Sequence, residues 1–242
     1  MRLDRFLADA GIGTRNEVKK IIRSGRITAD DKTVTKPETH IDCEKSIVCI
    51  DGQKIAYRKF IYLMLNKPQG YISATWDKRL PTVVDLLPAE YRHFEPFPVG
   101  RLDIDTEGLL ILTNDGALSH RLLSPKKHVP KKYFMHTEKP FTDSDIAAFG
   151  SGLTLDDGFH TLPAELSVLS LSEPYSAQVT IFEGKFHQVK RMAEAVGNRV
   201  TYLQRIEING LCLDSELQLG EMRELTAAEL ALLDPNGTEE KQ

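Results

Sequence analysis

Three carboxylates gather in one polar stretch of the 242-residue chain. Asp103, Asp105 and Glu107 stand at alternate positions, and the apolar run Leu109–Thr113 follows them directly. Loops that are positioned by rigid strands are where catalytic groups tend to lie. Neighbouring carboxylates allow one to act as nucleophile or base while hydrogen bonds hold the others. A solvated loop with a capping aspartate is the alternative that these residue types leave open.

Cations gather in a second stretch, where Glu183 and Gly184 predict a turn that leads into a helix. The apolar residues of this helix, from Val189 to Val196, are spaced to face the core. The opposite face carries His187, Lys190, Arg191 and Glu194. Three potential cations at a helix start could bind an anion or pair with a buried carboxylate. A solvated helix face is the alternative.

A basic stripe marks the N-terminal region. Periodicity predicts a helix over residues 3–10 and a second one that starts at Thr14, with Glu17 completing a capping box and Gly25 following its end. Residues 1–36 have a net charge of +4. Such a stripe suits contacts to phosphates, although an ordinary solvated helix face would have the same composition. The basic residues are Arg15, Lys19 and Arg23 at helical spacing, with Lys20 and Arg26 close by.

The elements that must position these groups alternate irregularly. Short β-like pieces follow the two N-terminal helices and end in an Asp51-Gly52 turn. Lys131 and Lys132 open a further strand with Tyr133, a residue type that usually packs in the core. Because the regular strand–helix rhythm of a doubly wound fold is absent, we expect an α+β fold around a mixed, mainly antiparallel sheet flanked by helices. The predicted strands of the larger part are 61–65, 109–113, 133–137, 164–169, 176–182 and 202–208.

Composition narrows the class of protein. With 41% hydrophobic and 27% charged residues, the chain is not a wholly disordered one. The net charge of −4 argues on its face against a nucleic-acid partner, but residues 1–58 carry +3 and residues 59–242 carry −7. Three cysteines without paired spacing predict reduced thiols and neither a disulfide framework nor a metal site. No leader or membrane-spanning run is apparent, so we expect a cytoplasmic monomer with no membrane partner.

The N-terminal stretch "RLDRFLADAGIGTRNEVKKIIRSGRITADDKTV" resembles the small RNA-binding domain, or alpha-L motif, named after ribosomal protein S-four. The match covers residues 1 to about 55. It departs at Ala29-Asp30-Asp31-Lys32, where that family usually has a turn containing glycine. A turn without glycine is less well suited to positive φ angles.

The remaining motifs resemble those of the pseudouridine synthases. The stretch "GRLDIDTEGLLILTNDG", the Lys-x-Tyr of residues 131–133 and "EGKFHQVKRM" at 183–192 occur in the order of that family. With "MLNKPQGY" at 64–71 and "LSPKKHVPKKY" at 123–133, they are most similar to the RsuA-like branch, which acts on ribosomal RNA and carries the alpha-L domain in front. The resemblance implies an RNA-binding domain over 1–58, a catalytic domain over 59–232 and a polar, disordered tail over 233–242.

The resemblance also implies roles for single residues. Asp103 would be the catalytic carboxylate, as nucleophile at C1′ or as base at the sugar. Tyr133 would lie against the base, and Lys190 would keep Asp103 ionised and oriented. Lys190 stands where other branches have arginine, so a point charge replaces a bidentate fork. The substrate-binding residues would be Arg101, Leu203, His187 and Gln188, and RNA phosphates would be bound by Arg15, Lys19, Lys20, Arg23 and Arg26.

Two of these roles have structural alternatives. Arg101 is a candidate to hold the flipped uridine or its phosphate, and it could instead pair with Asp105 or Glu107. Leu203 could be an apolar wall under the base or simply part of the core.

The chemistry implied is isomerisation of uridine to pseudouridine without cofactor or metal. The RsuA-like features point to one uridine in small-subunit (16S) rRNA. A large-subunit (23S) target and a non-catalytic RNA-binding or ribosome-assembly protein are the alternatives. The intact set of catalytic residues argues against the second alternative. A glycosidase-like enzyme would need two separated carboxylates in defined roles, whereas one clear candidate is present.

Overall fold

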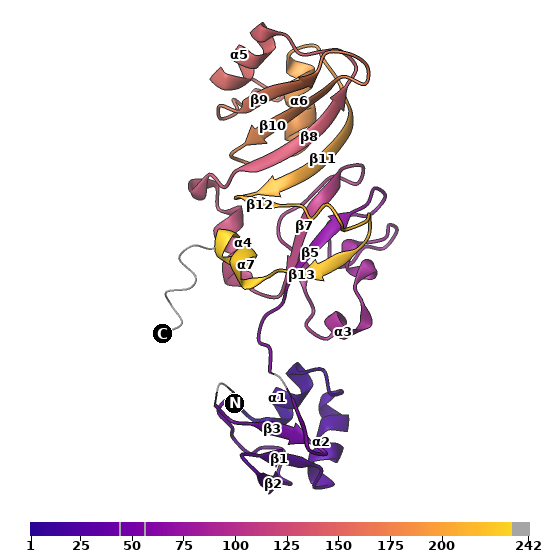
Figure 1. Cartoon of the computed structure of the whole chain (residues 1–242), viewed down its shortest axis with the longest axis vertical. Helices are drawn as coiled ribbons and strands as arrows, with labels where there is room; N and C mark the ends of the chain where they lie inside the picture. Colours follow the sequence, from indigo (N-terminus) through magenta and orange to yellow (C-terminus); the bar gives the residue numbers. More distant parts are fainter. Residues whose placement is uncertain (44, 56, 234–242) are drawn as a thin grey trace. The chain divides into compact units, whose positions relative to one another are not determined.

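The computed structural model describes residues 1–43, 45–55 and 57–233. The chain divides into two compact units (Figure 1): residues 1–61 with 88–95 form the first, and residues 62–87 with those from 96 onward form the second. The first unit includes the short helix α3 (Ala89–Arg92). The expected boundary after residue 58 stays a prediction. The polar tail expected at the C-terminus lies, from residue 234 on, outside the described residues.

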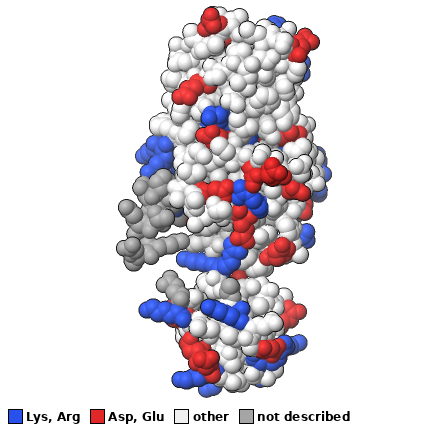
Figure 2. All heavy atoms as spheres, in the orientation of Figure 1, with Lys and Arg blue, Asp and Glu red and all other residues white. Residues whose placement is uncertain are grey.

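Charged side chains of both signs are interspersed on the face drawn in Figure 2. In the second unit, some of the acidic side chains are bound in ion pairs. Arg223 on β13 (Met222–Glu224) binds Asp214 through Nε at 2.5 Å and Glu229 through Nη2 at 2.7 Å. The hydrogen bond from Arg223 lowers the pKa of Glu229 to about 2. This network fixes α7 (Ala227–Leu233) to the sheet edge.

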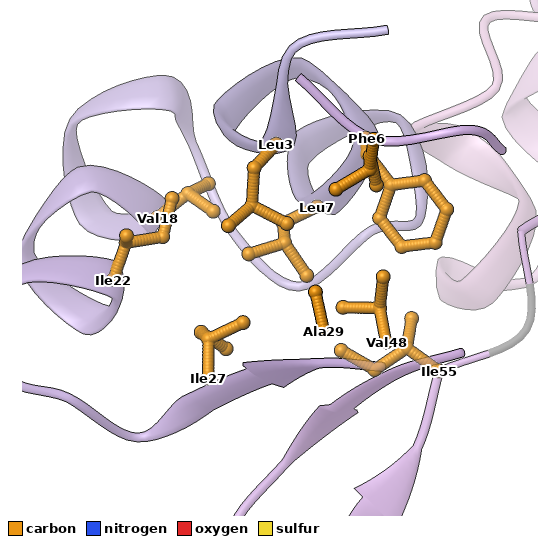
Figure 3. Packing of buried hydrophobic residues seen from close by; sticks show 10 residues of the cluster. Leu3, Phe6, Leu7, Val18, Ile22, Ile27, Ala29, Val48 and Ile55 are labelled. Atoms are coloured by element: carbon orange, nitrogen blue, oxygen red, sulfur yellow. The ribbon is translucent and has the colours of Figure 1, made fainter. Parts of the chain in front are cut away.

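The first unit packs two helices against a small sheet. Its helices are α1 (Leu3–Asp9) and α2 (Arg15–Arg23), and the Thr14–Glu17 capping box expected for α2 is confirmed. The sheet has the order β2-β1-β3-β4, with β1 (Ile27–Ala29), β2 (Lys32–Val34), β3 (Val48–Ile50) and β4 (Gln53–Lys54). Figure 3 shows the shared core, which contains Leu3, Phe6, Leu7, Val18, Ile22, Ile27, Ala29, Ile41, Val48 and Ile55.

The turn that lacks glycine takes positive φ angles all the same. Asp30 has φ 50° and Asp31 has φ 61°, which connects β1 to β2 as a two-residue hairpin. The expectation from residue type was therefore wrong at this point. Aspartate is one of the few residue types that enter the left-handed region readily. A hydrogen bond of 2.9 Å from the Ile47 N–H to Asp30 Oδ1 helps to hold the turn.

The second unit is built on one large sheet. Among the described residues β7 and β11 pair in parallel and the other strand pairs are antiparallel, in the order β13-β5-β7-β11-β8-β10-β9, with β12 on β11 and β6 on β7. This arrangement confirms the α+β expectation. The strands are β5 (Tyr62–Lys67), β6 (Phe97–Pro98), β7 (Glu107–Thr113), β8 (Lys131–Thr137), β9 (Glu165–Ser170), β10 (Ser176–Ile181), β11 (Val200–Ile208) and β12 (Leu211–Cys212).

Helices complete the second unit. Asp115 caps the helix that follows β7, because its Oδ1 accepts hydrogen bonds from two backbone N–H groups of the first turn. The helix α5 lies beside β9 at one end of the sheet (Figure 1). No helix among the described residues is long and apolar enough to cross a membrane. The helices are α4 (Gly116–Leu123), α5 (Asp143–Ser151) and α6 (Gln188–Ala195), with 3-10 turns at Val83–Leu86 and Pro125–Lys127.

Candidate active site

The carboxylate loop, residues 101–106, lies between β6 and β7. Its backbone is hydrogen-bonded to the end of β5 and to the loop that follows β5. Lys67, at the end of β5, donates hydrogen bonds through Nζ to the carbonyl oxygens of Asp103 at 3.0 Å and Thr106 at 2.9 Å. Ser73 Oγ bonds both the carbonyl and the N–H of Leu102 at 3.0 Å. The carboxylate loop is therefore fixed by its backbone, which leaves its acidic side chains available.

Lys67 is an unusual anchor because its side chain is fully buried. Burial removes water from the ammonium group and lowers the pKa of Lys67 to about 8, against the attraction of the nearby carboxylates. A buried charge is costly unless it is hydrogen-bonded. Three backbone carbonyls accept from this ammonium group at short distance, including that of Pro68 at 3.1 Å, and the carbonyl of Ile104 lies at 3.5 Å. The cation thus stabilises one conformation of the acidic loop.

Two side chains from the start of α6 face Asp103. Lys190 Nζ lies 3.4 Å from Asp103 Oδ2, and His187 Nε2 lies 3.6 Å from Oδ1. Lys190 also binds Asp105 at 2.5 Å, so one ammonium group is shared by two carboxylates. Burial raises the pKa of Asp105, but the hydrogen bond and charge of Lys190 outweigh it and hold that pKa below its usual range. The closer ion pair is thus with Asp105.

The stretch that presents these cations is braced by its own hydrogen bonds. Gln188 is buried, donates to Glu183 Oε1 at 2.9 Å and accepts from the Lys185 N–H at 2.9 Å. Arg191 binds Asp156 and Asp157, which ties α6 to the loop before β9. The amide of Gln188 and the guanidinium of Arg191 are therefore engaged within the protein.

A cavity of about 840 Å³ opens over Asp103. Its volume lies within the range typical of small-molecule sites. Tyr133 on β8 and Leu203 on β11 line it, and both are more than nine-tenths buried. Lys131 and Arg205 also line it, and burial, followed by the charge of Arg205, lowers the pKa of Lys131 to about 8. The cavity therefore combines a carboxylate, apolar walls and cations on rigid strands.

Comparison with known proteins identifies this arrangement. Residues 61–195 match the family described as RNA pseudouridylate synthase, and residues 1–48 match the S4 domain. The chain belongs to the RNA pseudouridylate synthase family. This RNA pseudouridine synthase carries an S4 domain in front of its catalytic unit, as the sequence motifs predicted.

Similar proteins cover almost the whole length of the synthase. An uncharacterized RNA pseudouridine synthase of Bacillus subtilis, YtzG, is 49% identical over 97% of this chain and 98% of its own. The ribosomal small subunit pseudouridine synthase A of Escherichia coli is 41% identical over 96% of this chain and 99% of its own. A crystal structure of a pseudouridylate synthase has a TM-score of 0.68 at 35% identity and covers 96% of this chain and 99% of that one.

The structure brings most of the predicted substrate site of the synthase together. Asp103, Tyr133, Leu203, His187 and Gln188 all line the cavity, and Lys190 pairs with Asp103. Arg101 lines it too, with an exposed side chain. Among the described residues Asp105 binds Lys190 and Glu107 accepts from the Tyr202 hydroxyl, and no ion pair joins Arg101 to either carboxylate.

The predicted phosphate-binding residues of the S4 domain differ in availability. Arg15, Lys20 and Arg23 are exposed on α2, and Lys19 is half-buried. Arg26 is exposed but binds Asp51, with Nη2 at 2.5 Å from Oδ2. Four of the five basic side chains are thus free of an ion pair among the described residues, whereas Arg26 is engaged with Asp51 in the turn between β3 and β4.

Three residues of the site were not singled out from the sequence. Lys67 belongs to the motif at 64–71, but its burial depends on the loop folding over it. Arg205 is 3% exposed, and its Nε donates to the carbonyl of Leu109 at 2.8 Å across the parallel β7–β11 pair. Lys131 was noted as the start of a strand and of the Lys-x-Tyr motif, without a role of its own. For Arg205 the available signal was its place inside the predicted strand 202–208, because arginine is seldom fully buried without a partner. Lys67 and Lys131 lie outside the predicted strands and gave no such signal.

Proposed function

We propose that this pseudouridine synthase isomerises one uridine of small-subunit (16S) rRNA, with Asp103 as its catalytic carboxylate. The position of Asp103 supports the proposal: it lies in the cavity wall, paired with Lys190 and next to His187. The substrate assignment is supported by the 41% identity, over nearly the full length, to relatives named ribosomal small subunit pseudouridine synthase A.

The reaction breaks the N1–C1′ bond, turns the uracil and joins C5 to C1′, after which C5 loses its proton and N1 gains one. Asp103 acts at the sugar, either by attack on C1′ or as a base. Lys190 pairs with the carboxylate and fixes its direction, while Lys67 holds the backbone of the same loop. Because the carboxylate is in place before the RNA binds, little reorganisation is needed at the reacting carbon.

The uracil must remain in the site while it turns. Tyr133 and Leu203 supply buried walls on neighbouring strands, so the base can be held by contact on its faces. Extrusion of a uridine from a folded RNA costs a few kcal/mol. Arg101, exposed at the cavity, is placed to bind the displaced nucleotide or its phosphate, and the basic side chains of α2 offset part of the cost by binding RNA elsewhere.

Tritium release tests this proposal. RNA fragments of both ribosomal subunits, labelled with tritium at C5 of uridine, are incubated with the protein, and label released to water is counted. We expect release from a small-subunit fragment and none from large-subunit fragments. Release from large-subunit RNA alone would refute the target, and no release from any fragment or from partly assembled subunits would refute the activity.

Two aspartate variants separate the catalytic carboxylate from its neighbour. Asp103→Asn should abolish release because the carboxylate that acts at the sugar is lost. Asp105→Asn is the matched control, since Asp105 shares Lys190 but is not among the residues that line the cavity. It should leave measurable release. Retained release in Asp103→Asn together with loss in Asp105→Asn would exchange the two roles and overturn the assignment.

A further inference from the structure

One aromatic side chain at the cavity is left uncovered by the protein. Phe186 precedes α6, lines the cavity, and is 72% exposed. A single exposed apolar residue is common on protein surfaces and needs no explanation by itself. Two further observations distinguish Phe186: its backbone is fixed, and its ring is held in a defined orientation beside the carboxylate loop.

The backbone around Phe186 is rigid. The carbonyl of Phe186 accepts a hydrogen bond of 3.4 Å from Arg191, whose guanidinium is bound to Asp156 and Asp157. The next residue, His187, has φ 49°, in the left-handed region that costs a non-glycine residue about 1–2 kcal/mol. The turn is therefore maintained against strain, and the exposure of Phe186 is not the result of a loose loop.

The ring itself is also oriented. The rings of Phe186 and His187 are stacked, with centroids 3.8 Å apart and planes inclined by 17°. His187 Nε2 in turn lies 3.6 Å from Asp103 Oδ1. The Asp103 carboxylate, the His187 imidazole and the Phe186 ring thus lie in consecutive contact, with Phe186 at the solvent-exposed end. Among the described residues the Phe186 ring stacks on His187 alone, so its other face is open.

We infer that Phe186, backed by His187, is a stacking platform for a nucleobase next to the target uridine. This inference rests on the proposed function, in which a uridine leaves its stack in RNA to reach Asp103. When that uridine leaves, its neighbours lose a stacking partner, and an aromatic ring at the mouth of the site replaces it. Stacking on a ring is tolerant of sequence because every base has a π-face. Phe186 would therefore position the RNA strand without reading its sequence.

A double-mutant cycle, in which the Phe186 ring and a neighbouring base are removed singly and together, tests the inference. We measure kcat/KM for tritium release with wild-type protein and Phe186→Leu, on the modified RNA fragment and on versions with an abasic nucleotide on the 5′ or the 3′ side of the target. Stacking of one base corresponds to about 5- to 150-fold in affinity. Phe186→Leu should lower kcat/KM by that factor on intact RNA, and one of the two abasic substitutions should do the same in the wild type.

The combination of both changes decides the question. If the ring contacts the base, Phe186→Leu should lose nothing further when that base is removed, because interacting groups are not additive. Phe186→Trp should restore kcat/KM, and Leu171→Ala, at a position that is also 72% exposed but does not line the cavity, should leave it unchanged. Fully multiplicative losses, or an unaffected Phe186→Leu, would refute the platform.

Two controls keep this result separate from other failures. The urea midpoint of Phe186→Leu should equal that of the wild type because the ring is exposed, and a large fall would show that the ring acts only on the fold. The RNA used is whichever fragment the wild type modifies. A large-subunit fragment would overturn the proposed target and still test the platform.

Discussion

Replacement of Lys67 by methionine isolates the contribution of the buried ammonium group to the active site. Methionine has nearly the length of lysine and fits an apolar space, so the packing change is small. It removes the donor of three hydrogen bonds, to the carbonyls of Pro68, Asp103 and Thr106, at 2.9–3.1 Å. The carboxylate loop then keeps its covalent neighbours but loses its anchor from β5.

The expected magnitude is the difference between two terms. Three hydrogen bonds from a charged donor contribute about 4.5–9 kcal/mol together. Against this, the pKa of Lys67 falls from 10.5 to about 8, which corresponds to about 3 kcal/mol of unfavourable charging that methionine avoids. We therefore expect Lys67→Met to lower the free energy of unfolding by about 1–6 kcal/mol. Because a small displacement of a catalytic group is costly, kcat should also fall, by a few-fold to about 100-fold.

Urea unfolding and tritium release measure the two effects. Lys132→Met is the matched control: Lys132 is partly exposed and pairs with Glu207 at 2.9 Å, so its loss should cost at most about 1 kcal/mol. A Lys67→Met protein within about 0.5 kcal/mol of the wild type, with unchanged kcat, would refute the role of Lys67 as an anchor.

The same pair of proteins gives a prediction for pH. Between pH 8 and 10.5 the unfolded state binds more protons at Lys67 than the folded state does, so this group makes the wild type more stable as the pH rises. The stability of the wild type minus that of Lys67→Met should therefore increase by up to about 3 kcal/mol across this window. Other groups cancel in the difference. A difference that stays flat from pH 7.5 to 10.5 would contradict the depressed pKa.

Other changes test the sheet and the S4 domain. A Cβ at Gly108 (φ 98°) would lie 2.3 Å from a backbone oxygen of β11, so Gly108→Ala should cost roughly 2–5 kcal/mol in urea unfolding. Gly210→Ala, at φ 83° with open space around it, should cost only about 1–2 kcal/mol, and equal losses would disprove the close approach. Arg15→Ala with Lys19→Ala should reduce the slope of the logarithm of the RNA-binding constant against the logarithm of salt concentration by about 1.4–1.8. Arg26→Ala should leave this slope unchanged, since Arg26 is held in an ion pair. An unchanged slope in the double variant would mean that the stripe is only solvated.

Local patterns were sufficient to predict the longer strands of the second unit and the N-terminal helices. Alternation and capping depend on neighbouring residues, so the Thr14–Glu17 box and the strands from 61–65 to 202–208 were predicted within a few residues of their observed bounds. The Asp30-Asp31 turn was misjudged because residue type gives only an average preference, whereas a contact with Ile47 fixes the observed φ angles. Short strands such as β6 and β13 were missed, since two or three residues carry too little periodicity.

The site itself could be predicted only in part, for a reason that its geometry makes clear. The motifs showed which residue types belong to it, but the contacts of Lys67 and Lys190 with the carboxylate loop span 36 to 87 positions of sequence. The expected Lys190–Asp103 pair is present, yet the shorter contact of Lys190 is to Asp105. The sharing of Lys190 between two carboxylates depends on the position of α6 relative to the carboxylate loop, and no local sequence pattern predicts that position.

The two lysines of the site divide the work of holding Asp103 between backbone and side chain. Lys67 donates to carbonyl oxygens of the loop, so it holds the loop backbone independently of the conformation of the Asp103 side chain. Lys190 contacts the carboxylates of Asp103 and Asp105, so the strength with which it holds them depends on their charge. Loss of Lys67 should therefore lower stability and kcat together, whereas loss of Lys190 should lower kcat with a smaller effect on stability. Because Asp105 shares the ammonium group of Lys190, the position of Lys190 does not depend on Asp103 alone.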